Sequence, residues 1–179
     1  MTEFLKHGFR LEKGIVLTAE RVHQPQKFHP SVVVRPLETD QEWEDSVPIQ
    51  VACGNDSLSK EQWEGFARSQ LGRYRKMVRA GLGAWFGAYL GEKQVGSLGI
   101  FTDGDIGRFQ IVSVHPDYQR RGICGAMVFK TASHAFERMG VRTLVMVADE
   151  EYHAAKIYES VGFAPTEKIV GVCWWDKSR

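Results

Sequence analysis

The stretch that decides the fold runs from Val112 to Ala126 and reads VSVHPDYQRRGICGA. A β-branched run ends at Pro116, and a loop with two glycines opens into a segment whose apolar residues recur at helical spacing as far as Met139. A glycine loop between a strand and a helix points backbone N–H groups outward at the positive end of the helix dipole. The sequence therefore predicts an anion site at this turn, with Arg120 and Arg121 adding charge beside it.

A βαβ unit surrounds this loop in the predicted structure. The strand 107–114 precedes the helix, and Thr143 to Ala148 (TLVMVA) after it is a short apolar run that is typical of a buried parallel strand. Before the unit, residues 84–90 and 94–101 flank a glycine turn and form a hairpin, which 107–114 extends to a three-stranded meander.

The outer elements are predicted from caps, breakers and local pattern. A strand at 31–35 precedes a helix from Thr39 or Asp40 to about residue 53, which Pro48 should make irregular or broken. A longer helix spans 60–80 with Ser57 or Ser59 as its cap. The remaining elements are a short helix at 151–160 and a last strand at 167–174. Residues 1–30 are expected to form an extension, with a hairpin around Lys13-Gly14 followed by a linker.

Composition excludes several classes of protein. The 179 residues are 43% hydrophobic and 25% charged with a net charge of +1, which suits one globular domain and gives no basic tail for nucleic acid. The apolar runs are too short for a membrane helix, and the N-terminus lacks the apolar stretch of a signal peptide, so a cytoplasmic location is expected. Three widely spaced cysteines and single histidines predict free thiols and no metal site.

Two motifs at a fixed separation resemble the GNAT (GCN5-related) N-acetyltransferase superfamily. The first is Val114-x-Pro116-x-Tyr118 followed by Gln119-Arg120-Arg121-Gly122-Ile123-Cys124, and the second is Ala154-x-x-Ile157-Tyr158-Glu159-x-x-Gly162-Phe163. A Rossmann site would need GxGxxG after an early strand, and a phosphate-binding Walker loop would need Gly-Lys-Ser/Thr; this loop has neither. The resemblance implies an α/β (α+β) fold, an α-β-α sandwich with a mixed, splayed sheet of about six to seven strands in residues 31–179.

The resemblance also implies a function, an acetyl-CoA-dependent N-acetyltransferase without a metal, whose acceptor is a small-molecule or peptide amine. A homodimer stays open. The residues that it assigns to the acetyl-CoA site are Val112, Ser113, Val114, Gln119, Arg120, Arg121, Gly122, Ile123, Cys124, Gly125 and Ala126. Tyr158 is the candidate general acid, because a phenol can protonate the departing CoA thiolate; the same spacing also suits a core aromatic residue.

Two residues depart from the family pattern. Cys124 stands where Gly or Ala is usual, and its thiol is either a quiet inward-facing group or one whose pKa the helix N-terminus lowers. Glu151 stands where many relatives carry an asparagine that contacts the pantetheine arm. These departures leave open a non-catalytic acyl-CoA-binding regulatory module, or an interaction domain that has lost CoA, on the same fold.

The general base and the acceptor site are not assigned by the sequence. The candidate bases are Asp103, Asp105, His115, Asp149, Glu150, Glu151 and His153, and none is preferred. The basic residues of the helix 60–80 suit either a solvated face or a surface for an acidic acceptor. Related proteins line their acceptor cleft with the regions that hold Trp43, Trp63, Trp85 and Phe86, although core aromatic residues would give the same pattern.

Overall fold

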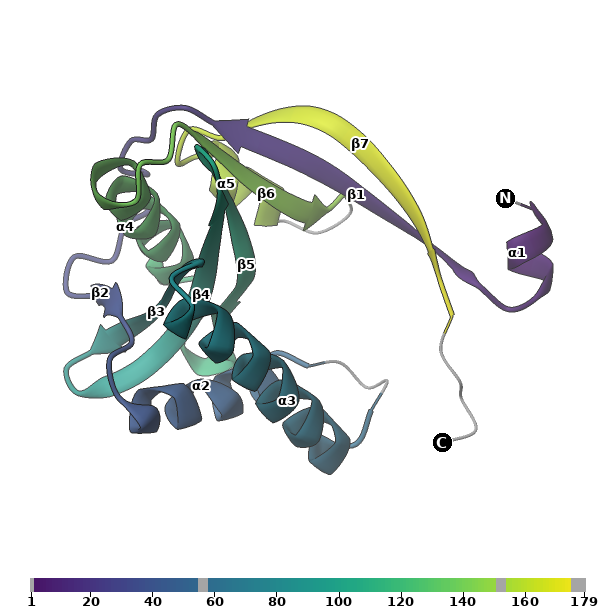
Figure 1. The fold of residues 1–179 in the computed structure, drawn as a ribbon, viewed down its shortest axis with the longest axis horizontal. Helices are drawn as coiled ribbons and strands as arrows, with labels where there is room; N and C mark the ends of the chain where they lie inside the picture. Colours follow the sequence, from purple (N-terminus) through teal and green to yellow (C-terminus); the bar gives the residue numbers. More distant parts are fainter. Residues whose placement is uncertain (1, 55–57, 151–153, 175–179) are drawn as a thin grey trace.

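The computed structural model describes residues 2–54, 58–150 and 154–174 (Figure 1). The elements are α1 (Thr2–Lys6), β1 (Arg10–Ala19), β2 (Val33–Pro36), α2 (Asp40–Ala52), α3 (Lys60–Arg79), β3 (Gly83–Leu90), β4 (Lys93–Asp103), β5 (Ile106–Val114), the short 3₁₀ turn Pro116–Tyr118, α4 (Ile123–Arg138), β6 (Thr143–Asp149), α5 (Ala154–Glu159) and β7 (Ala164–Cys173).

One mixed sheet of seven strands, in the order β2-β3-β4-β5-β6-β1-β7, forms the middle layer of the described structure. The β5–β6 pair is parallel and every other pair is antiparallel. The chain therefore makes the predicted meander from β3 to β5 and the predicted βαβ crossover from β5 through α4 to β6.

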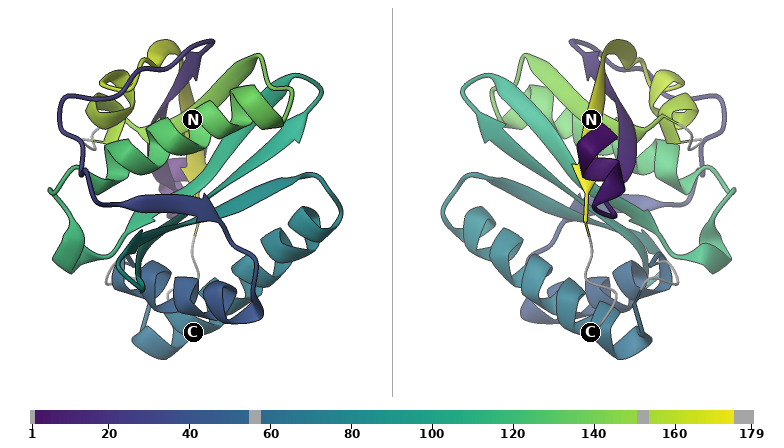
Figure 2. Two further views of the ribbon diagram at one scale, coloured as in Figure 1. Left: turned by 90° about the vertical axis from the view of Figure 1, so that its left-hand side faces the viewer. Right: turned by 90° about the vertical axis from the view of Figure 1, so that its right-hand side faces the viewer.

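Helices cover the two faces of this sheet unequally (Figures 1 and 2). The helices α4 and α5 lie over one face and bury the larger core, which includes Leu98, Met127 and Leu144. The helices α2 and α3 lie over the other face and enclose a smaller core around Trp43 and Trp85. The predicted α-β-α sandwich is confirmed.

The helix α2 is continuous, so the predicted break at Pro48 is wrong. Proline removes one backbone hydrogen bond and costs about 3 kcal/mol inside a helix. Here Trp43, Val47 and Ile49 are at least nine-tenths buried on either side of it, and burying such side chains is worth about 1.5–3 kcal/mol each. The free energy gained by packing the helix against the sheet outweighs the free energy lost at Pro48.

Salt bridges join α2 to α3 and pair several of the basic side chains of α3 with carboxylates. The guanidinium of Arg68 contacts the carboxylates of Glu44 and Glu64, and that of Arg75 contacts Asp40. Arg79 lies 3.7 Å from the same Asp40 carboxylate. Three of the basic side chains on α3 therefore face acidic partners of this chain, which favours the structural interpretation of that face.

The N-terminal strand differs most from expectation. Residues 10–19 form one continuous strand, so the predicted hairpin around Lys13-Gly14 is wrong. The strand lies between β6 and β7, pairing with β6 over Gly14–Ala19 and with β7 from Arg10 to Thr18. A stretch that was expected to precede the domain thus belongs to its sheet, and Leu17 is fully buried there.

On the N-terminal side of Gly14, residues 10–13 of β1 pair with β7 alone. Here the two strands extend away from the rest of the domain as an arm, with α1 near its tip (Figure 1). The exposed apolar side chains of this arm are Leu11, Ile169, Val170 and Val172. In the described ranges no helix is both long and apolar enough to cross a membrane.

Candidate functional site

The sheet opens between its two parallel strands. Only three residue pairs join them, Ile106 to Arg108 on β5 with Thr143 to Val145 on β6. Past Arg108 the two strands part, and in the described part of the chain no strand lies beside the main-chain groups on this side of β5 as far as Val114. The parting exposes the segment that holds the predicted site residues Val112, Ser113 and Val114.

A β-bulge lies on β5 at this opening. The register with β4 shifts so that Leu98 faces both Ile111 and Val112, and Ile111 has φ 44°. A β-branched residue at positive φ is strained by about 1–3 kcal/mol, and such strain concentrates at functional sites. The bulge turns backbone groups of β5 toward the opening, where a main-chain N–H can bind a carbonyl oxygen.

The loop after β5 presents unpaired amides. Arg120 has φ 59° and Gly122 has φ 80°, so the chain reverses sharply just before α4. Among the described residues, no acceptor takes a hydrogen bond from the N–H groups of Arg120 to Gly125. Consecutive free amides at a helix N-terminus form an anion-binding cradle, as the sequence predicts.

Side chains fix this loop against the sheet. The Gln119 amide donates to the Val114 carbonyl at 3.0 Å, and the Arg121 guanidinium donates to the Asp117 carbonyl at 2.7 Å. Ile123 and Ala126 are buried in the larger core, so a ligand meets only their backbone. Arg120 is exposed and forms no ion pair with a described residue, which leaves its charge available to an anion.

The two glycines of the loop face the segment between β1 and β2 rather than open space. A Cβ on Gly122 would lie 2.9 Å from the Lys27 carbonyl oxygen, and one on Gly125 would lie 3.0 Å from Pro25 Cγ. The segment continues along α4, where the rings of Phe28 and Phe129 meet edge to face. Close packing by this segment therefore requires the glycines, in addition to any phosphate contact.

The Cys124 sulfur is turned into the protein and packs against the larger core. Burial raises the pKa of its thiol to about 12. Of the two interpretations left open by the sequence, the structure favours an unreactive, inward-facing cysteine, because a thiol with so high a pKa is not ionised near neutral pH.

Tyr158 lies on α5, which packs on β6, β1 and β7 and against α4. Its side chain is 7% exposed within the larger core, and its ring centroid lies 6.5 Å from that of Phe163. This placement is compatible with both interpretations of the sequence, a core aromatic residue and an acid beside the opening.

Three candidate bases lie away from the opening or are already paired. Asp103 and Asp105 are at the β4–β5 turn, roughly 20 Å along β5 from the bulge at about 3.3 Å per residue. The Glu150 carboxylate contacts Lys168 Nζ, which lowers the pKa of that carboxyl.

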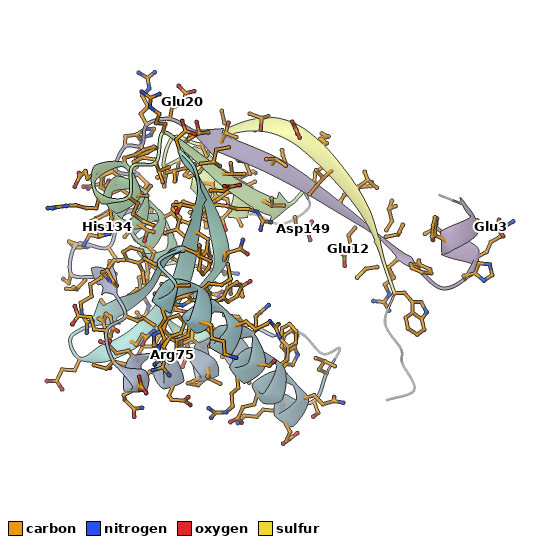
Figure 3. All side chains as sticks on the ribbon, viewed as in Figure 1. Glu3, Glu12, Glu20, Arg75, His134 and Asp149 are labelled. Carbon is orange, nitrogen blue, oxygen red and sulfur yellow. The ribbon has the colours of Figure 1, made fainter. Side chains whose placement is uncertain are left out.

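His115 and Asp149 are better placed, because they lie at the carboxyl ends of the two parallel strands that part. The Asp149 side chain points toward the space beneath the arm (Figure 3). His115 accepts a hydrogen bond on Nδ1 from the Asp117 N–H at 3.4 Å. The remaining candidates, Glu151 and His153, lie outside the described residues.

A small pocket adjoins the bulge on the face covered by α2 and α3. Its volume is about 240 Å³, and its lining residues are Gln50, Cys53, Trp63, Phe66, Ala67, Gln70, Ile111 and Ser113. Of the four aromatic residues considered from the sequence, only Trp63 lines this pocket; Trp43, Trp85 and Phe86 are core residues. Sequence reasoning missed Gln50, Cys53 and Gln70, because single residues on helices carry no motif.

Cys53 sits where the pocket meets β5. Its sulfur donates to the Val114 carbonyl at 3.3 Å, and desolvation raises the pKa of the thiol. A protonated thiol is a poor nucleophile, which argues against an acyl-cysteine intermediate there. No group of three or more potential metal-ligating side chains comes together within the described ranges.

Comparison with known proteins identifies the family. Residues 81–165 match the family model described as an acetyltransferase (GNAT) domain. This chain carries a GNAT domain. The match spans both motifs, the bulged strand β5 and the α4 N-terminus. No curated protein matches the sequence.

Solved structures share the fold of this GNAT domain at low identity. A functionally unknown conserved protein from Staphylococcus epidermidis has a TM-score of 0.71 and 13% identity, over 95% of this chain and 64% of that one. A GCN5-related N-acetyltransferase from Sphaerobacter thermophilus has a TM-score of 0.67 and 17% identity, over 96% and 55%. This chain therefore spans less than two thirds of either protein.

A third structure contains coenzyme A. It is the PaiA N-acetyltransferase from Thermoplasma acidophilum in complex with coenzyme A, with a TM-score of 0.59 and 13% identity, over 72% of this chain and 86% of that one. At such identity the likeness concerns the fold alone.

Proposed function

We propose that this protein transfers an acetyl group from acetyl-CoA to a primary amine by direct attack on the thioester. The observation that carries the proposal is the opening between β5 and β6, which lies beside the unpaired amides from Arg120 to Gly125. An extended arm ending in a thioester fits the opening, and its diphosphate fits the amides. The PaiA N-acetyltransferase, which shares this fold, forms a complex with coenzyme A, and this supports a CoA thioester as the donor.

Each chemical role goes to a group of this chain. The amides at the start of α4, with Arg120 nearby, hold the diphosphate. A backbone N–H at the bulge stabilises the oxyanion that forms when the amine nitrogen attacks the carbonyl carbon. The C–N bond forms, the C–S bond breaks, and Tyr158 protonates the departing thiolate. The proton that the amine nitrogen loses passes through solvent and restores the Tyr158 hydroxyl, so the protons balance.

A second function, a CoA-binding module without turnover, is favoured by one observation. Of the described candidate bases, Asp103 and Asp105 lie roughly 20 Å along the strand from the bulge, and the Glu150 carboxylate is paired with Lys168. In that case the chain would bind CoA and acetylate nothing.

The test measures binding and turnover separately. Calorimetry with CoA should give a micromolar dissociation constant, and CoA release from acetyl-CoA should depend on an added amine. Tyr158→Phe should keep the CoA affinity and lower kcat about 10²–10⁴-fold, the usual contribution of a general acid. Unchanged kcat in this variant removes the role of Tyr158, and binding without turnover on a broad amine panel supports the module instead.

A further inference from the structure

The pocket beside the bulge has a neutral lining. Its described lining residues carry two carboxamides, one indole N–H, one hydroxyl and one thiol as polar groups, and no carboxylate, imidazole, ammonium or guanidinium. The pKa of the thiol is raised, so it too is uncharged near neutral pH. Among the described lining residues, an acceptor that enters here meets no counter-ion and no base.

This neutrality matters for the nitrogen that attacks. An alkylamine resembles the lysine side chain, with a pKa of about 10.4, and is a cation at pH 7. It would have to lose both its water shell and a proton before attack, and burying an unpaired cation is costly. An aromatic amine is neutral at pH 7, because its lone pair is shared with the ring, so it needs neither a counter-ion nor a base.

The size and shape of the pocket also suit a ring. Its volume of about 240 Å³ is below the roughly 300 Å³ at which pockets for drug-sized ligands begin. The Trp63 and Phe66 rings meet edge to face with centroids 5.7 Å apart, and both line the pocket. Ala67 and Ile111 complete an apolar wall for one flat group.

One polar side chain on this wall lacks a partner. Gln50 is 7% exposed, and neither Nε2 nor Oε1 has a hydrogen-bond partner among the described residues. A buried amide without partners is costly and rare, which points to a ligand group that completes it. Because Gln50 offers a donor and an acceptor together, its complement is another carboxamide.

We infer that the acceptor is an aromatic amine of one ring that carries an uncharged carboxamide, with Gln50 as the residue that selects it. The inference rests on the proposed acetyl transfer and names its substrate class. The neutral nitrogen attacks the thioester carbonyl, the C–S bond breaks, and the proton lost from nitrogen balances the one gained by the CoA thiolate. No proton has to be removed beforehand.

The test compares acceptors that differ in one feature. At pH 7, kcat/KM for 4-aminobenzamide should exceed that for 4-(aminomethyl)benzamide at least tenfold, because the second compound is an ammonium ion. It should also exceed that for 4-methylaniline, which lacks the carboxamide. A benzylic amine that is the better acceptor at pH 7 overturns the inference, and this result does not depend on any variant.

Variants then test Gln50. Gln50→Leu, which keeps the approximate volume, should lower kcat/KM for 4-aminobenzamide roughly 10–100-fold and abolish its advantage over 4-methylaniline. Gln41→Leu, on the exposed side of the same helix, should change neither value. An unchanged preference in Gln50→Leu, with the melting temperature preserved, contradicts the role of Gln50.

Failure of this inference can be told apart from failure of the proposed function. Turnover of alkylamines but not of aromatic amines leaves acetyl transfer standing and removes only the substrate class. Absence of turnover with every amine, measured alongside CoA binding by calorimetry, removes the proposed function itself.

Discussion

At the scale of single residues, Glu42 is a charged group with several contacts to its surroundings. Desolvation alone would raise the pKa of its carboxyl, but the Arg35 guanidinium and the backbone N–H groups of Thr39 and Glu38 outweigh it and lower the pKa to about 2. The same side chain accepts from the Tyr89 hydroxyl at 3.2 Å and completes the N-cap of α2. It thereby ties α2 to β2 and β3.

This arrangement predicts how stability depends on acid. Because the folded-state pKa of Glu42 lies below its ordinary 4.5, its contribution is complete above pH 4.5 and is lost as the pH falls toward about 2. With half-exposed Arg35 as the main partner, we expect about 1–2 kcal/mol. Urea unfolding of wild type and Glu42→Gln should therefore differ at pH 7 and converge near pH 2. A constant difference across that range contradicts the assignment.

At the scale of elements, the junction between the loop and α4 meets two demands at once. Gly122 needs positive φ to reverse the chain, and it also needs the absence of a side chain so that the Lys27 carbonyl can approach. Gly140, after α4, has φ 68° but nothing within 4 Å of its Cβ position. Comparing these two glycines therefore separates the free-energy cost of a positive φ from that of a clash with the Lys27 carbonyl.

Alanine at these two glycines should behave differently. Gly140→Ala should cost about 1 kcal/mol from the positive φ alone. Gly122→Ala should cost more, about 2–4 kcal/mol, and should weaken CoA binding because the adjoining amides move with it. Thermal unfolding and calorimetry with CoA measure both effects. Equal losses of stability in the two variants would show that the segment around Lys27 does not press on the loop.

Local pattern predicted the elements from β2 to α4 well, because each of them carries a signal within its own residues. The change of period after Pro116 gave the strand–loop–helix turn, and the second motif, some thirty residues later, supported the family resemblance. The continuity of α2 through Pro48 was missed, because it depends on packing against the sheet. Gln50 was also missed, since only the folded chain shows that its amide is buried without a partner.

At the scale of the whole molecule, the position of β1 in the sheet could not be predicted from the local sequence pattern. Its neighbours β6 and β7 begin at Thr143 and Ala164, and nothing in the residues of β1 encodes antiparallel pairing at such a separation. The strand joins β7 to the rest of the sheet, since β7 has no other strand neighbour in the described structure. The predicted domain limit at residue 30 therefore cuts through the sheet.

Deletion at the N-terminal side tests this dependence. Removal of residues 1–19 takes out β1 with fully buried Leu17 and leaves the edges of both β6 and β7 unpaired, so the product should be aggregated or unfolded. Removal of residues 1–8 spares the whole strand and should leave the unfolding transition within a few degrees of the original. Circular dichroism and gel filtration measure both. A cooperative transition in the longer deletion contradicts the role of β1.

The position of β1 also sets a delay during translation. The strand leaves the ribosome before either of its partners, and at about 5–20 residues per second the stretch between Ala19 and Thr143 takes roughly 6–25 s to synthesise. Throughout that interval the nascent chain exposes a β-forming segment whose proper neighbours do not yet exist. Each new molecule thus depends on chaperones, or on a low tendency of β1 to pair wrongly, until β6 and β7 have been made.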